Sequence, residues 1–341
     1  MRREGRALTL DTAQERGTVV VVGTGSAGMR HLEALNAMPA ASVIAVPMRQ
    51  ARREALAREG WKTARGIDEA AALGASACVV ATEPSAHVNE AMAALACGLD
   101  VLIEKPMAPS ASEASAITRR ARELKRQVFV GCVLRFSAAM AAVRRWLPDI
   151  GRIHAVRIEC RSYLPDWRPA RPYHDSYSAR KEEGGVLRDM IHEIDYAGWL
   201  FGWPEALQAR ALNLGRLGIA SEELAELSWQ APSGAVVSLG LDYVTRSPRR
   251  WMAAHGERGT VTGDLLSGAV SLWVNGSLQE RNLAQPRQAW FREQMEAFLR
   301  AGAEATDDRL ARGEEGIRAL AVCDAARRAS LSRREERVES P

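Results

Sequence analysis

The segment TVVVVGTGSAGMRHLEAL, residues 18–35, decides the fold of this 341-residue chain. It opens with a run of β-branched residues, as in a buried parallel strand, and a helical pattern follows its glycines. In this G-x-G-x-x-G arrangement the first glycine permits a tight turn and the second lets the backbone approach a pyrophosphate. The third lets helix and strand pack closely, and the helix start offers free N–H groups to phosphates. The residues predicted to bind a dinucleotide here are Gly23, Gly25, Ser26, Ala27 and Gly28.

The next expected strand, Ser42 to Val46, leads into a basic stretch. A site for NAD usually has an acidic residue about 20 positions after the last glycine, where it binds the ribose hydroxyl. This chain has Arg49, Arg52 and Arg53 there instead. Arginine pairs well with phosphate, so Arg49 is predicted to bind the cofactor, which we expect to be NAD(P) with NADP favoured over NAD. The alternative is that these arginines form a solvated helix face.

Two later expected strands, 77–81 and 101–103, are followed by the segments TEPSAH (82–87) and EKP (104–106). Open parallel sheets bind ligands at the carboxyl ends of their strands. The proline restrains the backbone of the lysine before it, although the sequence does not show whether that peptide bond is cis. The residues predicted to bind the cofactor here are Thr82, Pro84, His87, Glu104 and Lys105.

A helix is predicted from Val186 to Phe201, introduced by two glycines and ended by Gly202. Asp189 and His192 lie three residues apart, so they share one face of that helix. The helix is otherwise apolar, and buried charged groups are costly unless they are paired or used. His192 is therefore either a core histidine held by its own helix or part of an active site with Lys105.

Four segments together resemble the Gfo/Idh/MocA family, named for glucose–fructose oxidoreductase, inositol dehydrogenase and a rhizopine-catabolism protein. They are VVGTGSAGMRHLEAL (21–35), VVATEPSAH (79–87), VLIEKP (101–106) and GGVLRDMIHEIDY (184–196). The resemblance implies an α/β fold, with an N-terminal Rossmann domain that binds NAD(P). It also implies a C-terminal α+β domain with a large, mostly antiparallel open sheet.

We therefore expect a disordered tail at 1–17, the Rossmann domain at 18–136, a substrate-binding and oligomerisation domain at 137–331 and a polar tail at 332–341. Alternating apolar residues and turn signals place strands of the second domain at 153–162, 224–231, 235–243, 250–256 and 269–274.

The resemblance also implies hydride transfer between a nicotinamide and a ring hydroxyl or ketone of a sugar. On this reading His192 is the general acid/base, Lys105 bonds the reacting oxygen, and Asp189 orients His192 or a hydroxyl. Most of the family places the acid four residues before the histidine, whereas the spacing of three found here resembles a subgroup associated with bacterial surface-sugar pathways. The alternatives are a non-catalytic dinucleotide-binding protein of this fold, and an enzyme that recycles bound NAD in a net-nonredox reaction.

The segment from Tyr163 to Lys181 is too long for a simple connection, and long irregular segments are often functional. Its aromatic residues suit stacking on a sugar ring, and its basic residues suit a carboxylate or phosphate. We therefore expect an anionic or nucleotide-activated sugar. The alternative is a solvated loop whose charges pair with Glu182 and Glu183. The residues predicted to bind substrate are Arg135, Trp167, Arg168, Tyr177 and Arg180.

The composition of the chain also limits which classes of ligand and partner are expected. The net charge is only +4 and no nucleic-acid-binding module is recognisable, so nucleic acid is not an expected ligand. The five cysteines lack paired spacing and no apolar run would span a bilayer, so we expect a cytoplasmic protein without a metal, a disulfide framework or a membrane partner. Trp229, Trp251 and Trp273 fall on expected strands, either in the core or on a face that forms a homodimer or homotetramer through the C-terminal sheet.

Overall fold

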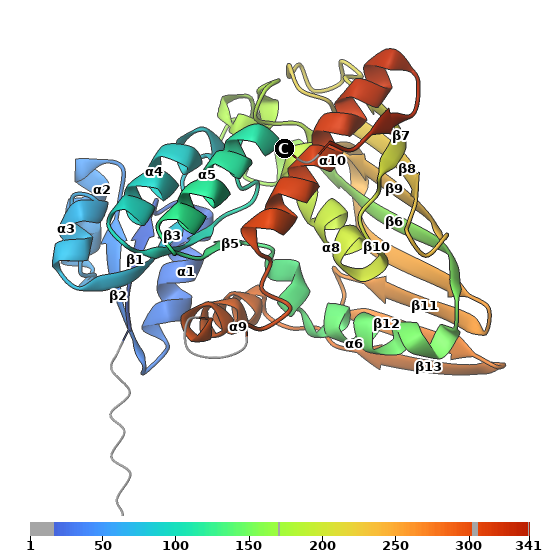
Figure 1. Ribbon diagram of the computed structural model, residues 1–341, viewed down its shortest axis with the longest axis horizontal. Helices are drawn as coiled ribbons and strands as arrows, with labels where there is room; N and C mark the ends of the chain where they lie inside the picture. The colour runs from blue at the N-terminus through green and yellow to red at the C-terminus, as the bar shows by residue number, and fades with distance from the viewer. Residues whose placement is uncertain (1–16, 170, 302–305, 340) are drawn as a thin grey trace, which may run out of the picture.

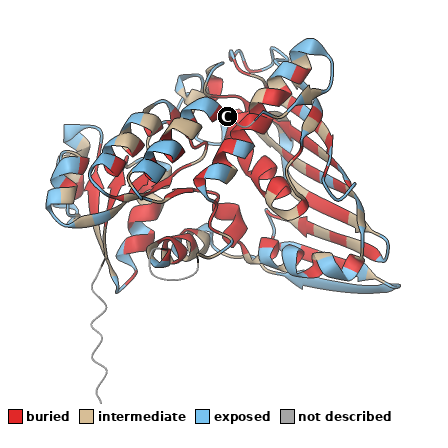
Figure 2. Ribbon diagram, viewed as in Figure 1, coloured by how far each residue is buried: buried red, intermediate tan, exposed pale blue. Residues whose placement is uncertain are grey.

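The computed structural model describes residues 17–169, 171–301, 306–339 and 341. The chain forms two bodies, each built on one sheet, and the long helix α10 (Gly313–Ser332) lies between them (Figure 1). The tail expected at 1–17 lies outside the described residues except for Gly17, which begins the first strand. Buried residues line the strands of both sheets and the helix faces that meet them (Figure 2).

The first body is a parallel five-stranded sheet in the order β2-β1-β3-β4-β5. Its strands are β1 (Gly17–Val22), β2 (Ala41–Val46), β3 (Ala75–Val80), β4 (Asp100–Ile103) and β5 (Val128–Val130). Its helices are α1 (Ser26–Asn36), α2 (Gln50–Arg58), α3 (Ile67–Ala72), α4 (Pro84–Ala96) and α5 (Ala111–Glu123). This confirms the expected Rossmann architecture.

Helices cover both faces of this sheet, because successive side chains of a strand point to opposite sides. Val19 and Val21 pack in a core with α1 and with α9 (Arg287–Arg300), whereas Val20 and Val22 pack with α3, α4 and α5. The direction of strand addition changes between β1 and β3. Ligands of open parallel sheets bind at such a switch point, so the fold places a ligand at the start of α1.

The second body is a nine-stranded sheet in the order β13-β12-β11-β10-β6-β9-β8-β7-β14. Among its described strands, β6 and β9 pair in parallel and the other pairs are antiparallel, which confirms the mostly antiparallel sheet. The strands are β6 (Ile153–Tyr163), β7 (Ala206–Leu212), β8 (Leu224–Gln230), β9 (Val236–Asp242), β10 (Val244–Gly256), β11 (Gly259–Asp264), β12 (Ala269–Val274), β13 (Ser277–Asn282) and β14 (Glu336–Arg337). Sequence patterns missed β7, β11, β13 and β14, the last of which lies in the stretch expected to be a polar tail; β13 is a polar edge strand in which every residue is exposed.

Helices cover one face of this sheet (Figure 1). They are α6 (Ala138–Trp146), α8 (Ile191–Phe201) and part of α10. Of the three tryptophans, Trp229 belongs to the core, whereas Trp273 is 49% exposed. Trp273 lies directly opposite Leu278 of the neighbouring strand, which is 57% exposed. An apolar patch therefore remains at the edge of the uncovered face.

The single helix expected from Val186 to Phe201 is in fact two. They are α7 (Val186–Asp189) and α8 (Ile191–Phe201). Met190 lies between them with φ −97° and ψ 29°. The carbonyl oxygen of Asp189 accepts a hydrogen bond from Nζ of Lys105 at 2.7 Å, and the N–H of Glu193 bonds to Met190 instead. A contact from the other body thus lies at the helix break, on the residue that sequence reasoning placed in the active site.

Candidate active site

The turn before α1 has the shape of a phosphate cradle, the name used here for residues 23–28. Gly23 has a φ of 87°, and a Cβ at Gly28 would lie 1.9 Å from the carbonyl oxygen of Gly23. At Gly25 a Cβ would meet no heavy atom within 4 Å, so the backbone there borders open space. Ser26 and Ala27 begin α1, whose first turn contains no acidic residue to repel an anion. These features fit a dinucleotide pyrophosphate.

One of the basic residues after β2, Arg52, contacts the helix that follows this cradle. Arg49 is exposed and immediately precedes α2. Nη2 of Arg52 lies 3.4 Å from Sδ of Met29, one residue beyond the cradle, and its Nη1 lies 3.5 Å from Glu59. The ribose end of a dinucleotide would therefore meet positive charge here.

Glu104 is buried and bonded to the first helix rather than open to solvent. Its Oε1 lies 2.7 Å from Nε2 of His31, and its Oε2 accepts the backbone N–H of Lys105 at 3.2 Å. Burial opposes its charge, but His31 and then Lys105 hold the pKa of Glu104 below its ordinary value. The carboxylate thus ties the strand that ends at Lys105 to α1. Its predicted contact with the cofactor stays a prediction.

The 82–87 segment is held against the loop that follows Lys105. The two ring nitrogens of His87 lie 3.0 Å from the carbonyl oxygen of Pro106 and 3.2 Å from that of Thr82. The peptide bond between Lys105 and Pro106 is cis. His87 is 1% exposed and burial lowers its pKa, so it holds the two loops together, and its predicted contact with the cofactor stays a prediction. Pro84 is the buried first residue of α4.

Lys105 and Asp189 meet although they come from different bodies. Nζ of Lys105 donates to the carbonyl oxygen of Asp189 at 2.7 Å and lies 3.8 Å from Oδ1. The Asp189 carboxylate also accepts hydrogen bonds from three hydroxyl groups, those of Tyr177, Ser178 at 2.5 Å and Tyr243 at 2.7 Å. Burial, followed by the charge of Asp189, raises the pKa of both tyrosines well above its ordinary value, so both stay donors at neutral pH. Sequence reasoning missed Ser178 and Tyr243.

His192 is buried, and its Nδ1 has no hydrogen-bond partner among the described residues. Burial lowers its pKa well below the ordinary value, and the charges of Lys105, Arg250 and Arg287 lower it further. Arg250 is itself neutralised, because its Nε and Nη2 donate to Glu193 at 2.6 and 3.1 Å. The imidazole is therefore neutral at pH 7 and able to accept a proton.

Part of the predicted substrate loop lies over the Asp189 carboxylate. The ring of Trp167 packs edge-on against Tyr243 with centroids 5.5 Å apart, and 39% of Trp167 is exposed. Arg168 is exposed, and its charge is close enough to act on Tyr177. Both residues are exposed and lie near tyrosines that bond Asp189, and their contact with a substrate stays a prediction.

Arg180 is placed differently. Its Nη1 lies 3.0 Å from Glu183 and its Nη2 lies 3.3 Å from Glu83, so two carboxylates already neutralise it at the surface. For this residue, the alternative interpretation of the loop as a set of surface ion pairs fits better than substrate binding.

The expectation that Arg135 binds substrate is wrong, because its side chain is fully buried. Its Nε and Nη2 donate to Asp195 at 2.9 and 2.6 Å, and Nη2 also donates to Glu315 at 2.8 Å. The guanidinium lies 5.0 Å from the ring centre of Trp199. The residue joins α8 to α10 and has no route to a ligand.

The site therefore combines a phosphate cradle, an ammonium with hydrogen bonds still to donate, and a neutral imidazole. Among the described residues, no group of three histidine, cysteine or carboxylate side chains is arranged to bind a metal ion. Such a site is equipped to bind a dinucleotide and to move a proton.

Two family models match the chain in succession. One, described as an oxidoreductase family with an NAD-binding Rossmann fold, matches residues 18–132, and the GFO/IDH/MocA C-terminal domain matches residues 119–262. The chain belongs to the Gfo/Idh/MocA oxidoreductase family. Membership makes this Gfo/Idh/MocA chain an NAD-binding oxidoreductase, which sets aside the non-catalytic alternative.

Relatives of this Gfo/Idh/MocA chain extend over almost its whole length. Inositol 2-dehydrogenase of Rhizobium meliloti is 28% identical over 336 residues, which cover 92% of this chain and 97% of the relative. The structure of a UDP-N-acetylglucosamine 3-dehydrogenase from Acidithiobacillus ferrooxidans matches with a TM-score of 0.77 and 22% identity, covering 93% of this chain and 98% of that one. A levoglucosan dehydrogenase in complex with NADH matches with a TM-score of 0.84 and 18% identity, covering 95% and 100%. At these identities the two structures establish the shared fold. In the described part of this Gfo/Idh/MocA protein, no helix is long and apolar enough to cross a membrane.

Proposed function

We propose that the chain transfers hydride between a nicotinamide cofactor and a hydroxyl or ketone carbon of a sugar or polyol. The observation that supports this most directly is the position of Lys105, which bonds to the main chain of Asp189 and lies close enough for its charge to lower the pKa of the neutral, incompletely bonded His192. The relatives named above act, by their names, on inositol, a nucleotide sugar and levoglucosan. When bound, the nicotinamide ring supplies the hydride acceptor or donor.

His192 is the proposed general acid/base. A carbinol that loses hydride must also lose its hydroxyl proton, and a neutral imidazole can accept that proton. The cations around His192 oppose the imidazolium that results. That form is therefore a strong acid, which suits return of the proton when the reaction runs as a reduction.

Lys105 is proposed to hydrogen-bond the reacting oxygen. An ammonium has three N–H groups, and one of them is directed at the carbonyl oxygen of Asp189. The others remain to stabilise negative charge on a developing alkoxide. The carboxylate of Asp189 is proposed to keep Tyr177 and Tyr243 in position and to accept a bond from a neighbouring substrate hydroxyl.

We further propose that the substrate is an anionic or nucleotide-activated sugar. Arg287, at the start of α9, lies close enough to His192 to lower its pKa. Burial lowers the pKa of Arg287 itself, and so do the charges of Arg250 and Arg30. Clustered like charges are relieved by a bound anion. Arg168 offers a second cation beside Tyr177.

The cofactor proposal is that NADP binds at least as well as NAD. Its support is the contact of Arg52 with Met29, one residue beyond the cradle, and the exposed Arg49, three residues before Arg52 at the start of α2. Titration of each reduced cofactor by fluorescence measures both dissociation constants, and Arg49→Ala should weaken NADPH binding more than NADH binding. A strong preference of the parent protein for NAD contradicts this proposal.

The substrate test is a panel of neutral sugars, inositols, sugar acids and nucleotide sugars, measured by cofactor absorbance. Analysis of products distinguishes net oxidation or reduction from internal recycling of bound NAD. Arg168→Ala and Arg287→Ala should each raise KM for an anionic substrate by about tenfold, the scale of one charge-assisted bond. Arg180→Ala is the matched control and should leave KM unchanged. Turnover of neutral compounds alone, unaffected by Arg168→Ala and Arg287→Ala, contradicts the anionic substrate.

Association of copies through the uncovered sheet face is also proposed. Trp273 and Leu278 form its exposed apolar edge, and exposed aromatic patches commonly mark subunit contacts. Sedimentation of Trp273→Glu should show a smaller species than the parent protein. A monomeric parent contradicts this proposal.

A further inference from the structure

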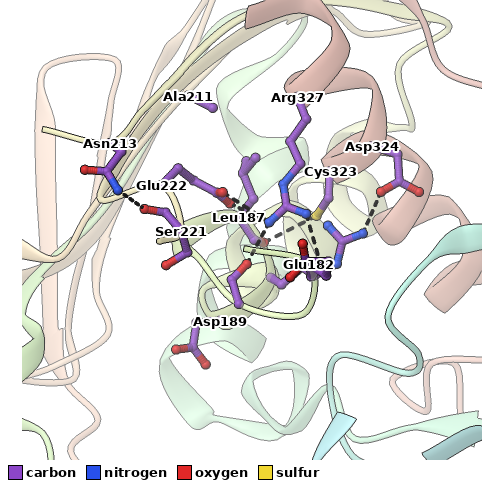
Figure 3. A network of polar contacts seen from close by, with 12 residues as sticks. Glu182, Leu187, Asp189, Ala211, Asn213, Ser221, Glu222, Cys323, Asp324 and Arg327 are labelled. Carbon is purple, nitrogen blue, oxygen red and sulfur yellow. Dashed lines mark hydrogen bonds and ion pairs between the residues drawn. The ribbon is translucent and has the colours of Figure 1, made fainter. Parts of the chain in front are cut away.

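Helix α10 holds the segment that leads into Asp189. Arg327 donates to the carbonyl oxygen of Gly184 at 2.7 Å, and Asp324 accepts a hydrogen bond from Arg188 at 2.7 Å. Figure 3 shows Arg327 and Asp324 extending from the helix toward this segment. Helix α10 also packs against α5 of the first body and β7 of the second, so this one helix contacts both bodies.

Arg188 bonds in addition to the loop that follows Lys105. Its Nε donates to the carbonyl oxygen of Pro109 at 2.7 Å, while its Nη2 donates to Oδ1 of Asp324 at 2.7 Å. Oδ2 of Asp324 accepts the backbone N–H of Ala111, the first residue of α5, at 3.3 Å. Only 3% of Arg188 is exposed. One ion pair, in which the arginine is buried and the Asp324 side chain is 28% exposed, therefore joins α7, α10 and the loop between Lys105 and α5.

These contacts lie on either side of the bond between Lys105 and Asp189. Arg188 immediately precedes Asp189, and Pro109 follows Lys105 by four residues in the same loop. A guanidinium is planar, so its donors hold Pro109 and Asp324 at a fixed distance and angle. We propose that Arg188 and Asp324 are positioning residues that fix the ammonium of Lys105 against α7, an inference that rests on the proposed function of Lys105.

The competing explanation is that the pair only strengthens packing between α5 and α10. The chain contains a matched control for that explanation. Nη2 of Arg122 on α5 lies 3.4 Å from Oε1 of Glu314 on α10, so this exposed pair joins the same two helices away from the site. If the Arg188–Asp324 pair only packs helices, then variants of both pairs should change stability without changing kcat or the pKa of His192. If it positions Lys105, only variants of the Arg188–Asp324 pair should change kcat or that pKa.

The experiment compares Arg188→Lys, Asp324→Asn and the control Arg122→Ala in the full chain. Arg188→Lys keeps a positive charge but loses the planar set of donors, so it tests geometry with little risk to folding. Unfolding midpoints and cofactor dissociation constants establish that each variant is folded and binds NAD(P). Activity is measured with whichever sugar or polyol the panel identifies.

Two readouts report on the position of Lys105. The first is kcat, which should fall at least about tenfold in Arg188→Lys and in Asp324→Asn, while KM stays within about twofold of the parent value. The reason is that a small misplacement of a catalytic group lowers the rate strongly. The second is the pKa of His192, measured by NMR titration and assigned with His192→Gln. Three cations face His192, namely Lys105, Arg250 and Arg287. A displaced Lys105 should let the pKa rise toward its ordinary value, and Lys105→Gln gives the full size of that rise.

Either readout supports the inference when it changes in a folded Arg188→Lys or Asp324→Asn protein and not in Arg122→Ala. If both variants keep kcat within about twofold and keep the pKa of His192, the pair is only structural and the inference is wrong. It is also wrong if kcat falls only in proportion to the unfolded fraction. Full activity of Lys105→Gln would instead overturn the proposed function, so the two failures are distinguishable.

Discussion

Two buried charged clusters lie against helix α8, and they differ in how completely their charges are paired. The first contains Arg135, Asp195 and Glu315, and the second contains Lys105, Asp189 and His192. In the first, Nε and Nη2 of the guanidinium donate to two carboxylates at 2.6 to 2.9 Å, its Nη1 lacks a partner among the described residues, and nothing of the arginine is exposed. In the second, the imidazole lacks a partner for Nδ1 among the described residues, and 19% of the lysine side chain is exposed.

The difference separates charges that stabilise a fold from charges that remain able to react. In the first cluster, called closed here, the charges pair with one another inside the protein. Removing either partner is costly, because the other charge would be left buried alone. A group with unused hydrogen-bonding capacity can bind or exchange a proton with a ligand. The two clusters therefore differ in both pairing and access: two carboxylates neutralise the fully buried guanidinium, whereas the lysine is partly exposed and the imidazole has no carboxylate bonded to it in the described part of the chain.

The largest expected effect is loss of the closed cluster. Arg135→Ala leaves Asp195 buried without its partner and should lower the free energy of unfolding by about 3–5 kcal/mol. Urea unfolding of the holoprotein measures it. Arg144→Ala is the matched control, because the Arg144 guanidinium also lies near Trp199, 4.6 Å from its ring centre, but pairs at the surface with Asp308. Equal losses in the two variants would remove the contrast between a closed and a surface pair.

Removing the reactive groups should leave the fold largely intact and abolish most of the activity. Lys105→Ala and His192→Ala should each lower kcat by about a hundredfold or more, the usual scale for losing acid–base or electrostatic assistance. Binding of NAD(P), followed by fluorescence, should be largely retained. Near-normal turnover in either variant would exclude that residue from the mechanism.

A smaller effect is expected from one hydroxyl group at the edge of the reactive cluster. Tyr243→Phe removes a donor from the buried Asp189 carboxylate and should cost about 1–3 kcal/mol in stability. Tyr196→Phe is the control, because the Tyr196 hydroxyl is buried with no partner among the described residues. Thermal unfolding of both variants tests the pair. A loss for Tyr196→Phe as large as that for Tyr243→Phe would mean that these contacts do not determine stability.

The smallest expected effect is the contribution of His192 to the pH dependence of stability. His192 has a lowered pKa when folded, so below its ordinary value of 6.5 the unfolded chain binds more protons than the folded chain. Stability should therefore fall as pH decreases through and below that value, by at most about 1.4 kcal/mol per pH unit for one group. Urea unfolding of His192→Gln and the parent protein between neutral and mildly acidic pH isolates this contribution. Parallel pH dependences would show that His192 does not contribute.

The sequence predicts the features whose partners are close along the chain. The cradle at 23–28 depends on a strand and a helix that flank it directly, and the core strands depend on local alternation. Arg135 was assigned wrongly because its partners lie 60 and 180 residues away. Tyr243 was missed for the same reason, since it is 54 residues from Asp189 and has no local signature. The helix break at Met190 likewise coincides with a distant contact, from a lysine 84 residues before the carbonyl that it bonds.

That break has a consequence for how the site can diversify. The ammonium of Lys105 is anchored by the main chain of residue 189, an atom that every amino acid provides. The side chain at this position can therefore change during evolution without releasing the lysine. Attachment of the lysine and selection among substrate hydroxyl groups are separable tasks at a single position. New specificities can thus arise at residue 189 while the lysine stays in place.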